Sequence, residues 1–267
     1  MDPSLQLLQG LLFALVIAFF SYWTRLLTRS GAAAQCVLGA LLLGFGGWAW
    51  TVPILVFFLG SAAISRVGRE KRRPMEKLFV KSGSRDLWQV LANGGVAGIL
   101  CLLWVFDPEP VTYIASLGAL GAAAADTWGT ELGTLSRRQP RLVTTLRPVE
   151  AGVSGGVTLL GTGAGGCGAA LVVLSGLPWV GPDSTIPALL AGVAGGIGGS
   201  LIDSLLGATL QRQYRCPACG RTTEGKNGCS HPDRIQSGLT WMTNDAVNLI
   251  ATASGALLAA ALFLALA

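Results

Sequence analysis

Long apolar stretches alternate with short polar connections along the whole chain. A helix of about 20 mostly apolar residues spans the hydrocarbon core of a bilayer, and Pro, Gly and charged residues separate such stretches here, as at 107–110 and 178–183. The third stretch is short and adjoins the second, so these two either cross separately or form a re-entrant hairpin. We therefore expect an all-α, polytopic membrane protein of about eight membrane-spanning helices, at 5–23, 31–48, 50–64, 87–106, 111–125, 153–177, 186–210 and 241–267.

The composition agrees with a chain whose main solvent is lipid. Charged residues make up 12% of the 267 residues and hydrophobic residues 51%, whereas a soluble domain carries about 25% charged residues. The stretch 1–23 lacks a basic n-region and a small-residue cleavage site, so we interpret it as a retained first helix. We expect a single transmembrane domain over 1–267.

The basic residues are sorted to one side of the predicted membrane. All 19 Lys and Arg residues lie in the connections after the first, third, fifth and seventh helices, while the opposite side carries Asp2, Asp107, Glu109 and Asp183. The positive-inside rule then places the basic connections in the cytosol and both termini outside. The net charge of +5 is explained by this topology, and no nucleic-acid partner is expected.

Several polar residues lie inside or at the ends of the apolar stretches. Ionisable groups at such positions are costly and are functional candidates by default. In the predicted topology they all fall at the cytosolic leaflet, where carboxylates and amides ringed by basic loops suit a hydrated metal ion and phosphates. The alternative is that each caps a helix or lies at the headgroup level. The residues are Asn93, Asp126, Glu131, Asp203, Asn244, Asp245 and Asn248.

The segment 141–158 combines hydroxyl groups, a base and a glycine pair before the sixth predicted helix. Free backbone N–H groups and the positive end of a helix favour an anion, although an ordinary capped helix entry would look similar. A Gly-x-Gly-x-x-Gly run follows at 161–166, but it lies in an apolar span without a βαβ unit, so we expect close helix packing there. The candidate anion-binding residues are Thr144, Thr145, Arg147, Ser154, Gly155 and Gly156.

The loop 212–240, between the last two helices, contains four soft ligands. Cys216 and Cys219 form a Cys-x-x-Cys pair, and Cys229 and His231 follow. Cytosolic thiols stay reduced, so we expect a structural zinc site in this loop and not disulfides. A loop of free thiols is the alternative.

Six of these segments resemble the integral membrane family formerly called domain of unknown function 92, which includes transmembrane protein 19 and the plant and cyanobacterial phytyl-phosphate kinases. They are 85–95, 125–133, 144–149, 152–158, 203–208 and 243–248, of which Asp-Thr-Trp-Gly-Thr-Glu-Leu-Gly at 126–133 is the most specific. The resemblance implies phosphoryl transfer from CTP or another nucleoside triphosphate to an isoprenyl monophosphate such as phytyl phosphate. The diphosphate product would serve tocopherol and quinone synthesis.

The resemblance and the residue pattern together suggest roles for the site residues. We expect Asp126, Asp203 and Asp245 to hold Mg²⁺, directly or through water, with Glu131 as a further ligand. Phosphate or substrate contacts are expected from Arg85, Asn93, Thr144, Thr145, Arg147, the amides of Gly155 and Gly156, Asn244 and Asn248.

Three other functions fit parts of the same pattern. A transporter of a cation or a phosphorylated lipid also uses intramembrane carboxylates and broken helices. A cytidylyltransferase would pass CMP to a lipid phosphate and release pyrophosphate. A scaffold without turnover would tolerate loss of all three aspartates.

Overall fold

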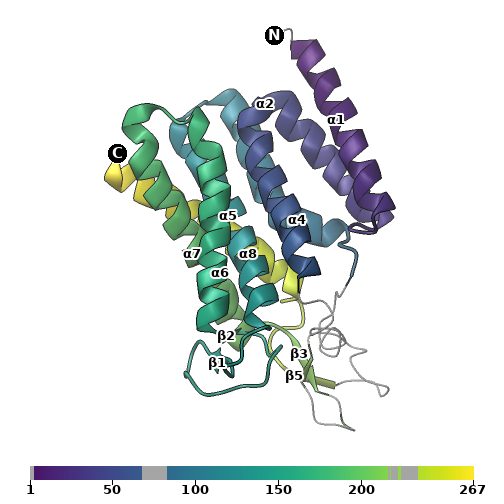
Figure 1. The fold of residues 1–267 in the computed structure, drawn as a ribbon, viewed down its shortest axis with the longest axis vertical. Helices are drawn as coiled ribbons and strands as arrows, with labels where there is room; N and C mark the ends of the chain where they lie inside the picture. The colour runs from purple at the N-terminus through teal and green to yellow at the C-terminus, as the bar shows by residue number, and fades with distance from the viewer. Residues whose placement is uncertain (1–2, 68–82, 216, 218–221, 224–233) are drawn as a thin grey trace.

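The computed structural model is a bundle of long helices with small strands at one end (Figure 1). It describes residues 3–67, 83–215, 217, 222–223 and 234–267. Both termini lie at one end of the bundle, and the strands lie at the other (Figure 1). The helices are α1 (Pro3–Trp23), α2 (Arg29–Arg66), α4 (Leu87–Phe106), α5 (Pro110–Gly133), α6 (Leu159–Gly176), α7 (Thr185–Thr209) and α8 (Asn244–Leu266).

The outer faces of the bundle are apolar. Phe106, Leu159 and Leu257 are 86%, 79% and 72% exposed, and such a coat of large apolar side chains is what a lipid-facing surface requires. Within the described residues, six helices are long and apolar enough to cross a membrane: α1, α2, α4, α6, α7 and α8. The chain is thus a multi-pass integral membrane protein. The end of the bundle that carries the strands is called the basic end below; its cytosolic placement and the count of eight spans stay predictions.

Helix α2 contains both the second and the third predicted stretches, joined by a bend. Gly47 has φ 67° and ψ −158°, a non-helical conformation that suits glycine. Residues from both sides of the bend reach the same point of α4, since Leu38 and Ile54 both lie close to the Cβ position of Gly94. The two stretches are therefore a helical hairpin whose two ends lie at the basic end of the bundle (Figure 1).

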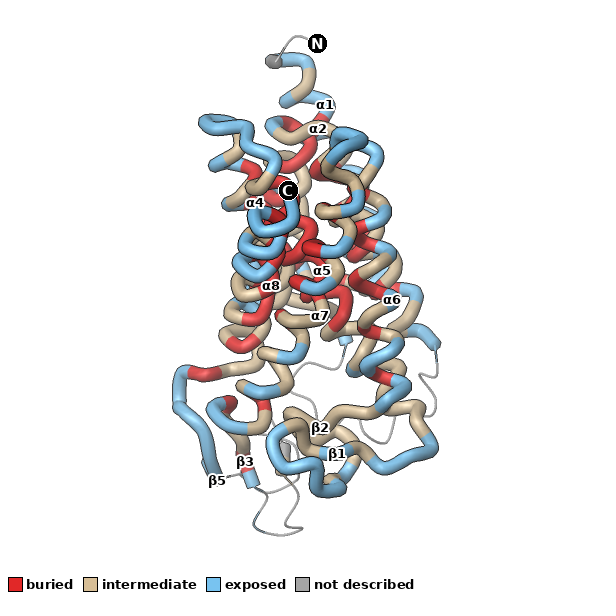
Figure 2. Tube along the Cα trace, turned by 90° about the vertical axis from the view of Figure 1, so that its left-hand side faces the viewer, coloured by how far each residue is buried: buried red, intermediate tan, exposed pale blue. Residues whose placement is uncertain are grey.

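Helix α5 forms the centre of the bundle. It is buried from Tyr113 to Ala125 and packs against α2, α4, α6, α7 and α8, so the red interior of Figure 2 follows it. The helix was expected to end at Ala125, but it runs on to Gly133. Residues 127–133 contain no proline, and the turns they add place Asp126 inside the helix and Glu131 in its last turn.

Small residues bring the backbones of α5, α6, α7 and α8 into contact. A Cβ atom at Gly195 of α7 would lie 2.6 Å from the carbonyl oxygen of Gly255 on α8, and one at Gly165 of α6 would lie 2.7 Å from that of Ala125 on α5. Membrane helices that approach this closely need glycine at the contact. In the run at 161–166 the predicted close packing is present at Gly161 and Gly165, which meet the backbone of α5, while Gly163 meets nothing within 4 Å.

Two small sheets cover the basic end. The antiparallel pair is β1 (Arg141–Leu142) and β2 (Gly156–Val157), and the other sheet has the order β4 (Thr222–Thr223), β3 (Gln213–Arg215), β5 (Arg234–Ser237). The sixth helix was expected to begin at Val153, but α6 begins at Leu159. Strand pairing takes up Gly156 and Val157, and the Thr158 side chain caps the helix by accepting from the Gly161 N–H at 2.9 Å.

Candidate functional site

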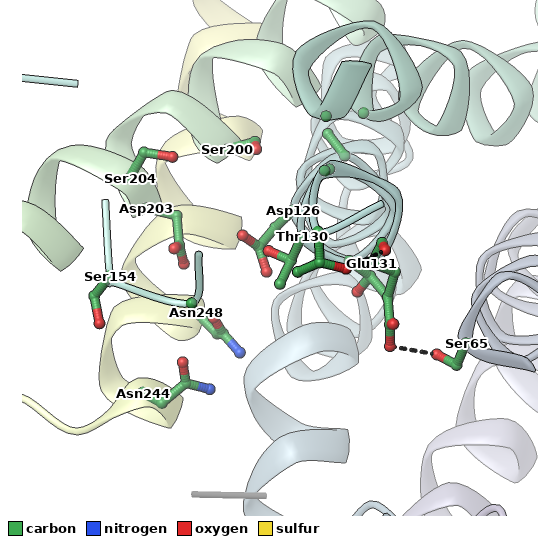
Figure 3. Close-up of a pocket in the computed structure, with 18 of the residues that line it drawn as sticks. Ser65, Asp126, Thr130, Glu131, Ser154, Ser200, Asp203, Ser204, Asn244 and Asn248 are labelled. Carbon is green, nitrogen blue, oxygen red and sulfur yellow. Dashed lines mark hydrogen bonds between the residues drawn. The ribbon is translucent and has the colours of Figure 1, made fainter. Parts of the chain in front are cut away.

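A cavity of about 760 Å³ opens at the basic end between α2, α4, α5, α6, α7 and α8. This volume lies in the range of sites for small organic ligands, about 300–1,000 Å³. Carboxylate, amide and hydroxyl side chains gather on its walls. The cavity is therefore the candidate site (Figure 3).

Two carboxylates enter the cavity from two helices that pack together. Asp126 on α5 and Asp203 on α7 both line it, both are half-buried, and Figure 3 shows their side chains turned toward the same space. Ser200 and Ser204 lie three residues before and one residue after Asp203 and also line it. The predicted convergence of these two aspartates is present in the structure.

Helix α8 contributes two amides and not its aspartate. Asn244 and Asn248 line the cavity, while Asp245 is not among its lining residues. Thr243 caps the helix by accepting from the Ala246 N–H at 3.3 Å, so Asn244 is the first helical residue. Residues four apart share a helix face, and the next residue is turned by about 100°. The structure thus does not bring Asp245 to the other two aspartates.

Glu131 lines the cavity but is directed to its α2 wall. Its Oε1 atom accepts a hydrogen bond of 2.8 Å from the Ser65 hydroxyl, and Figure 3 shows the carboxylate extending toward Ser65, away from Asp126. The side chain therefore ties α5 to the end of the α2 hairpin. Its predicted role as a metal ligand stays a prediction.

Two backbone hydrogen bonds hold the Arg85 main chain just before α4 begins. Its N–H donates to the Leu26 carbonyl at 2.9 Å, and its carbonyl accepts from the Thr28 N–H at 3.0 Å. Asp86 and Gln89 then form a capping box that starts α4. Desolvation lowers the pKa of Arg85 from its ordinary value, and the negative charge of Glu131 offsets part of that fall. Because arginine stays protonated, this desolvated cation favours an anion in the cavity.

Asn93 lies two turns into α4 on the same cavity wall. Its Nδ2 atom donates to the Gln89 carbonyl at 2.8 Å, and the residue lines the cavity. One residue earlier, the Ala92 carbonyl accepts from the Thr252 hydroxyl of α8 at 2.9 Å. This buried bond fixes the position of α4 along α8 next to Asn93.

The glycine pair lines the cavity, though from a strand connection and not from a helix N-terminus. Gly155 has φ 79°, and a Cβ atom there would lie 2.5 Å from Ala208 Cβ and 2.7 Å from the Ser204 carbonyl oxygen of α7. Gly155 therefore lets the loop lie directly on α7, with Ser154 and Gly156 on the cavity wall.

The remaining predicted anion-binding residues lie away from the cavity. Thr144, Thr145 and Arg147 are exposed and are not among its lining residues. The chain turns sharply here, since the Leu146 N–H donates to the Leu142 carbonyl at 2.8 Å and Leu146 has φ 56°. The turn carries their side chains past the end of the β1–β2 pair. The zinc candidates Cys216, Cys219, Cys229 and His231 lie outside the described residues.

Several hydroxyl-bearing residues of the cavity wall were missed by the sequence reasoning. These residues are Ser65, Thr130, Ser200 and Ser204. A hydroxyl group three or four residues from a carboxylate in an apolar span shares its helix face, and this signal could have found Ser200 and Thr130 but not Ser65 or Ser204.

The donor set fits a metal ion that arrives with phosphates better than a resident one. Within the part of the chain that the structure describes, no group of three or more His, Cys, Asp or Glu residues is placed to hold a metal ion. Mg²⁺ in nucleotide sites is held by one or two carboxylates together with substrate phosphates and water. Asp126 and Asp203, with amide and hydroxyl oxygens nearby, supply such a set.

The fold and the cavity define a polytopic membrane protein with a polar site at one end of its bundle. The family model described as integral membrane protein DUF92 matches residues 12–256, so the chain belongs to this family.

Named relatives cover nearly the whole chain. An uncharacterized membrane protein of Methanocaldococcus jannaschii is 36% identical over 80% of this chain and 87% of its own length. Protein PGR of Arabidopsis thaliana is 32% identical over 93% of each chain. An uncharacterized membrane protein of Synechocystis is 29% identical over 88% of this chain and 82% of its own. No solved structure matches the chain.

Proposed function

We propose that this protein is a membrane phosphotransferase that passes the terminal phosphoryl group of CTP, or of another nucleoside triphosphate, to an isoprenyl monophosphate such as phytyl phosphate. The observation that carries the proposal is the cavity itself. Two carboxylates and a desolvated arginine line it, at the end of an apolar bundle. A substrate with a charged phosphate on an apolar chain needs polar groups for its phosphate and an apolar surface for its chain, and this end of the bundle offers both.

The chemistry demands positioning and charge neutralisation more than proton transfer. An oxygen of the acceptor phosphate attacks the γ-phosphorus, the bond from that phosphorus to the bridging oxygen breaks, and the nucleoside diphosphate leaves. A phosphate acceptor is already ionised at neutral pH, so no general base is needed. Bound Mg²⁺ would supply charge neutralisation on the triphosphate.

Each wall of the cavity has a distinct task in this proposal. Asp126 and Asp203 would hold the metal that accompanies the nucleotide. Arg85 would bind the acceptor phosphate as a fixed cation. In the 152–156 loop the Gly156 N–H already donates to the Val153 carbonyl at 3.0 Å, so the Gly155 N–H is the one that would donate to a phosphate oxygen. Asn244 and Asn248 would orient the reacting groups.

The test is a transfer assay in membrane vesicles with phytyl phosphate, Mg²⁺ and CTP labelled at the γ-phosphate. We expect label in a lipid diphosphate, release of CDP, and loss of both in Asp126→Asn. The matched control is Asp183→Asn, an exposed aspartate at the opposite end of the bundle, which should keep native activity.

Other products would contradict the proposal in distinct ways. Release of pyrophosphate with CMP entering the lipid would mean cytidylyl transfer. Movement of a prenyl phosphate or a cation across sealed vesicles, without nucleotide turnover on CTP or ATP, would mean transport. Full transfer activity in Asp126→Asn would remove the carboxylate from the mechanism.

A further inference from the structure

A second, smaller cavity adjoins the site along α4. It has a volume of about 70 Å³ and lies among α1, both halves of α2, and α4. A single water needs about 10–15 Å³ in this measure, so the space is well above a packing defect. Its walls are almost entirely apolar, and include Phe13, Ile17, Leu38, Ile54, Leu55 and Phe58.

The two cavities meet along one stripe of polar residues. Of the described residues, Arg85, Gln89 and Asn93 line both cavities. Gln89 and Asn93 are four residues apart and so share a face of α4, and Arg85 lies directly before the helix. An apolar space and a polar one are therefore joined at a fixed cation.

We propose that the apolar cavity receives the phosphate-proximal part of the acceptor's hydrocarbon tail while Arg85 binds its phosphate. The acceptor would thus reach the site between α1, α2 and α4, and the nucleotide would occupy the Asp126 and Asp203 side. This placement rests on the proposed function for the chemical class of the acceptor.

Charge and polarity support one occupant for this joined space. Arg85 is desolvated and the charge of Glu131 offsets only part of that cost, so a further anion is favoured beside it, whereas the walls of the smaller cavity are almost entirely apolar. A phosphate on an apolar tail matches both halves at once. A free phosphate would leave the apolar cavity unused, and a plain hydrocarbon would make no use of the arginine's charge.

The size of the cavity limits how much of the tail it holds. A space of about 70 Å³ accepts a short length of chain, so the rest of the tail continues into lipid. Phe13 and Ile17 on the cavity wall are half-buried, and their neighbours Val16 and Phe20 are 52% exposed on the outer face of α1. Selectivity should therefore fall on the first part of the tail and not on its full length.

Photocrosslinking tests the placement directly. The probe is geranylgeranyl monophosphate with a diazirine near the phosphate end, used on the full chain in vesicles and followed by peptide mapping. We expect crosslinks to α1, α2 and α4 around Phe13, Ile17 and Leu55, and competition by unlabelled geranylgeranyl monophosphate. The non-phosphorylated alcohol should not compete, because it lacks the anion for Arg85.

Two variants and a matched control sharpen the test. Arg85→Gln removes a charge-assisted contact and should lower the crosslinking yield by about tenfold. Leu55→Trp fills the apolar cavity and should lower the yield similarly, while raising the KM for the prenyl phosphate and leaving the KM for CTP unchanged. Leu59→Trp lies one turn further along α2, at a side chain 56% exposed, and should match the native protein.

The outcomes separate this proposal from the proposed function. Crosslinks on the outer faces of α6 or α8, or equal labelling by a diazirine-bearing alcohol, would overturn the tail site even if phosphoryl transfer occurs. Phosphate-dependent crosslinks at α1, α2 and α4 without phosphoryl transfer would support the tail site and refute the kinase. Thermal unfolding of Leu55→Trp in detergent shows whether a low crosslinking yield reflects weaker binding or misfolding. If Leu55→Trp is misfolded, the crosslinking yield of Arg85→Gln decides whether the tail site exists.

Discussion

The two sides of the bundle are packed in different ways. Among α5, α6, α7 and α8, many glycines meet backbone atoms of a neighbouring helix, as where a Cβ at Gly199 would lie 2.6 Å from the Ala251 carbonyl oxygen. Around α2 and α4, glycines mostly meet large side chains, as where Leu38 covers Gly94 and Gly98. Contacts between backbones admit one spacing, whereas a leucine or tryptophan can adopt another rotamer.

The difference in packing matches the contents of the two sides. The backbone-packed side carries Asp126 and Asp203, whose separation a metal and phosphates would require to be constant. The side-chain-packed side contains the apolar cavity and the bend at Gly47. This contrast teaches that fixed polar groups and an adaptable apolar space are built by different residue sizes within one bundle.

The largest expected effect separates Asp203 from Asp245, two aspartates to which the sequence analysis gave the same role. Asp203→Asn removes a charge from the cavity and should lower phosphoryl transfer by about 100-fold or more. Asp245→Asn changes a residue that does not line the cavity, so transfer should fall far less. Initial rates in vesicles, at matched protein levels, measure both.

A reversed order for these two variants would contradict the assignment. Strong loss in Asp245→Asn with native activity in Asp203→Asn would mean that α8 presents a different face to the reacting groups. Equal and complete loss in both would return Asp245 to the predicted metal site.

The next effect concerns the rigidity of the backbone-packed side. Gly195→Ala places a methyl group 2.6 Å from the Gly255 carbonyl oxygen and 2.8 Å from Ala259 Cβ, so we expect destabilisation of about 1–3 kcal/mol. Gly163→Ala on α6 meets nothing within 4 Å and should be neutral or slightly stabilising, because alanine favours helix. Denaturation in detergent micelles compares them, and equal stabilities would refute the close approach of α7 to α8.

The smallest effect concerns the adaptable side. Leu38→Met keeps the volume over Gly94 and Gly98 in a more flexible side chain, so it should cost less than about 1.5 kcal/mol. Val37→Met, on a side chain that is 70% exposed, serves as the lipid-facing control and should change stability little. A loss at Leu38 as large as that at Gly195 would mean that both sides are packed equally tightly.

Much of the architecture could be predicted because hydropathy is read locally. Each apolar stretch contains its own evidence of membrane burial. The predicted ranges agree with the bounds of α1, α2, α4, α7 and α8 to within a few residues. The predicted end of α5 and the predicted start of α6 were wrong. Asp126 looked like a terminus although the helix continues past it, and the entry to α6 was taken up by strand pairing at Gly156.

The chain's own pattern was enough to identify a multi-pass membrane protein with its basic residues gathered in four connections, and to single out Asp126, Asp203, Asn244 and Asn248 as costly polar groups in apolar surroundings. It could not decide which side of each helix faces the cavity, since that depends on how every helix is rotated against its neighbours. Packing decided that Asn244 and Asn248 line the cavity and Asp245 does not, that Glu131 reaches Ser65, and that Arg85 lies between a polar and an apolar space. Burial in lipid is a sum over single residues, whereas a site is a property of contacts between residues far apart in the chain.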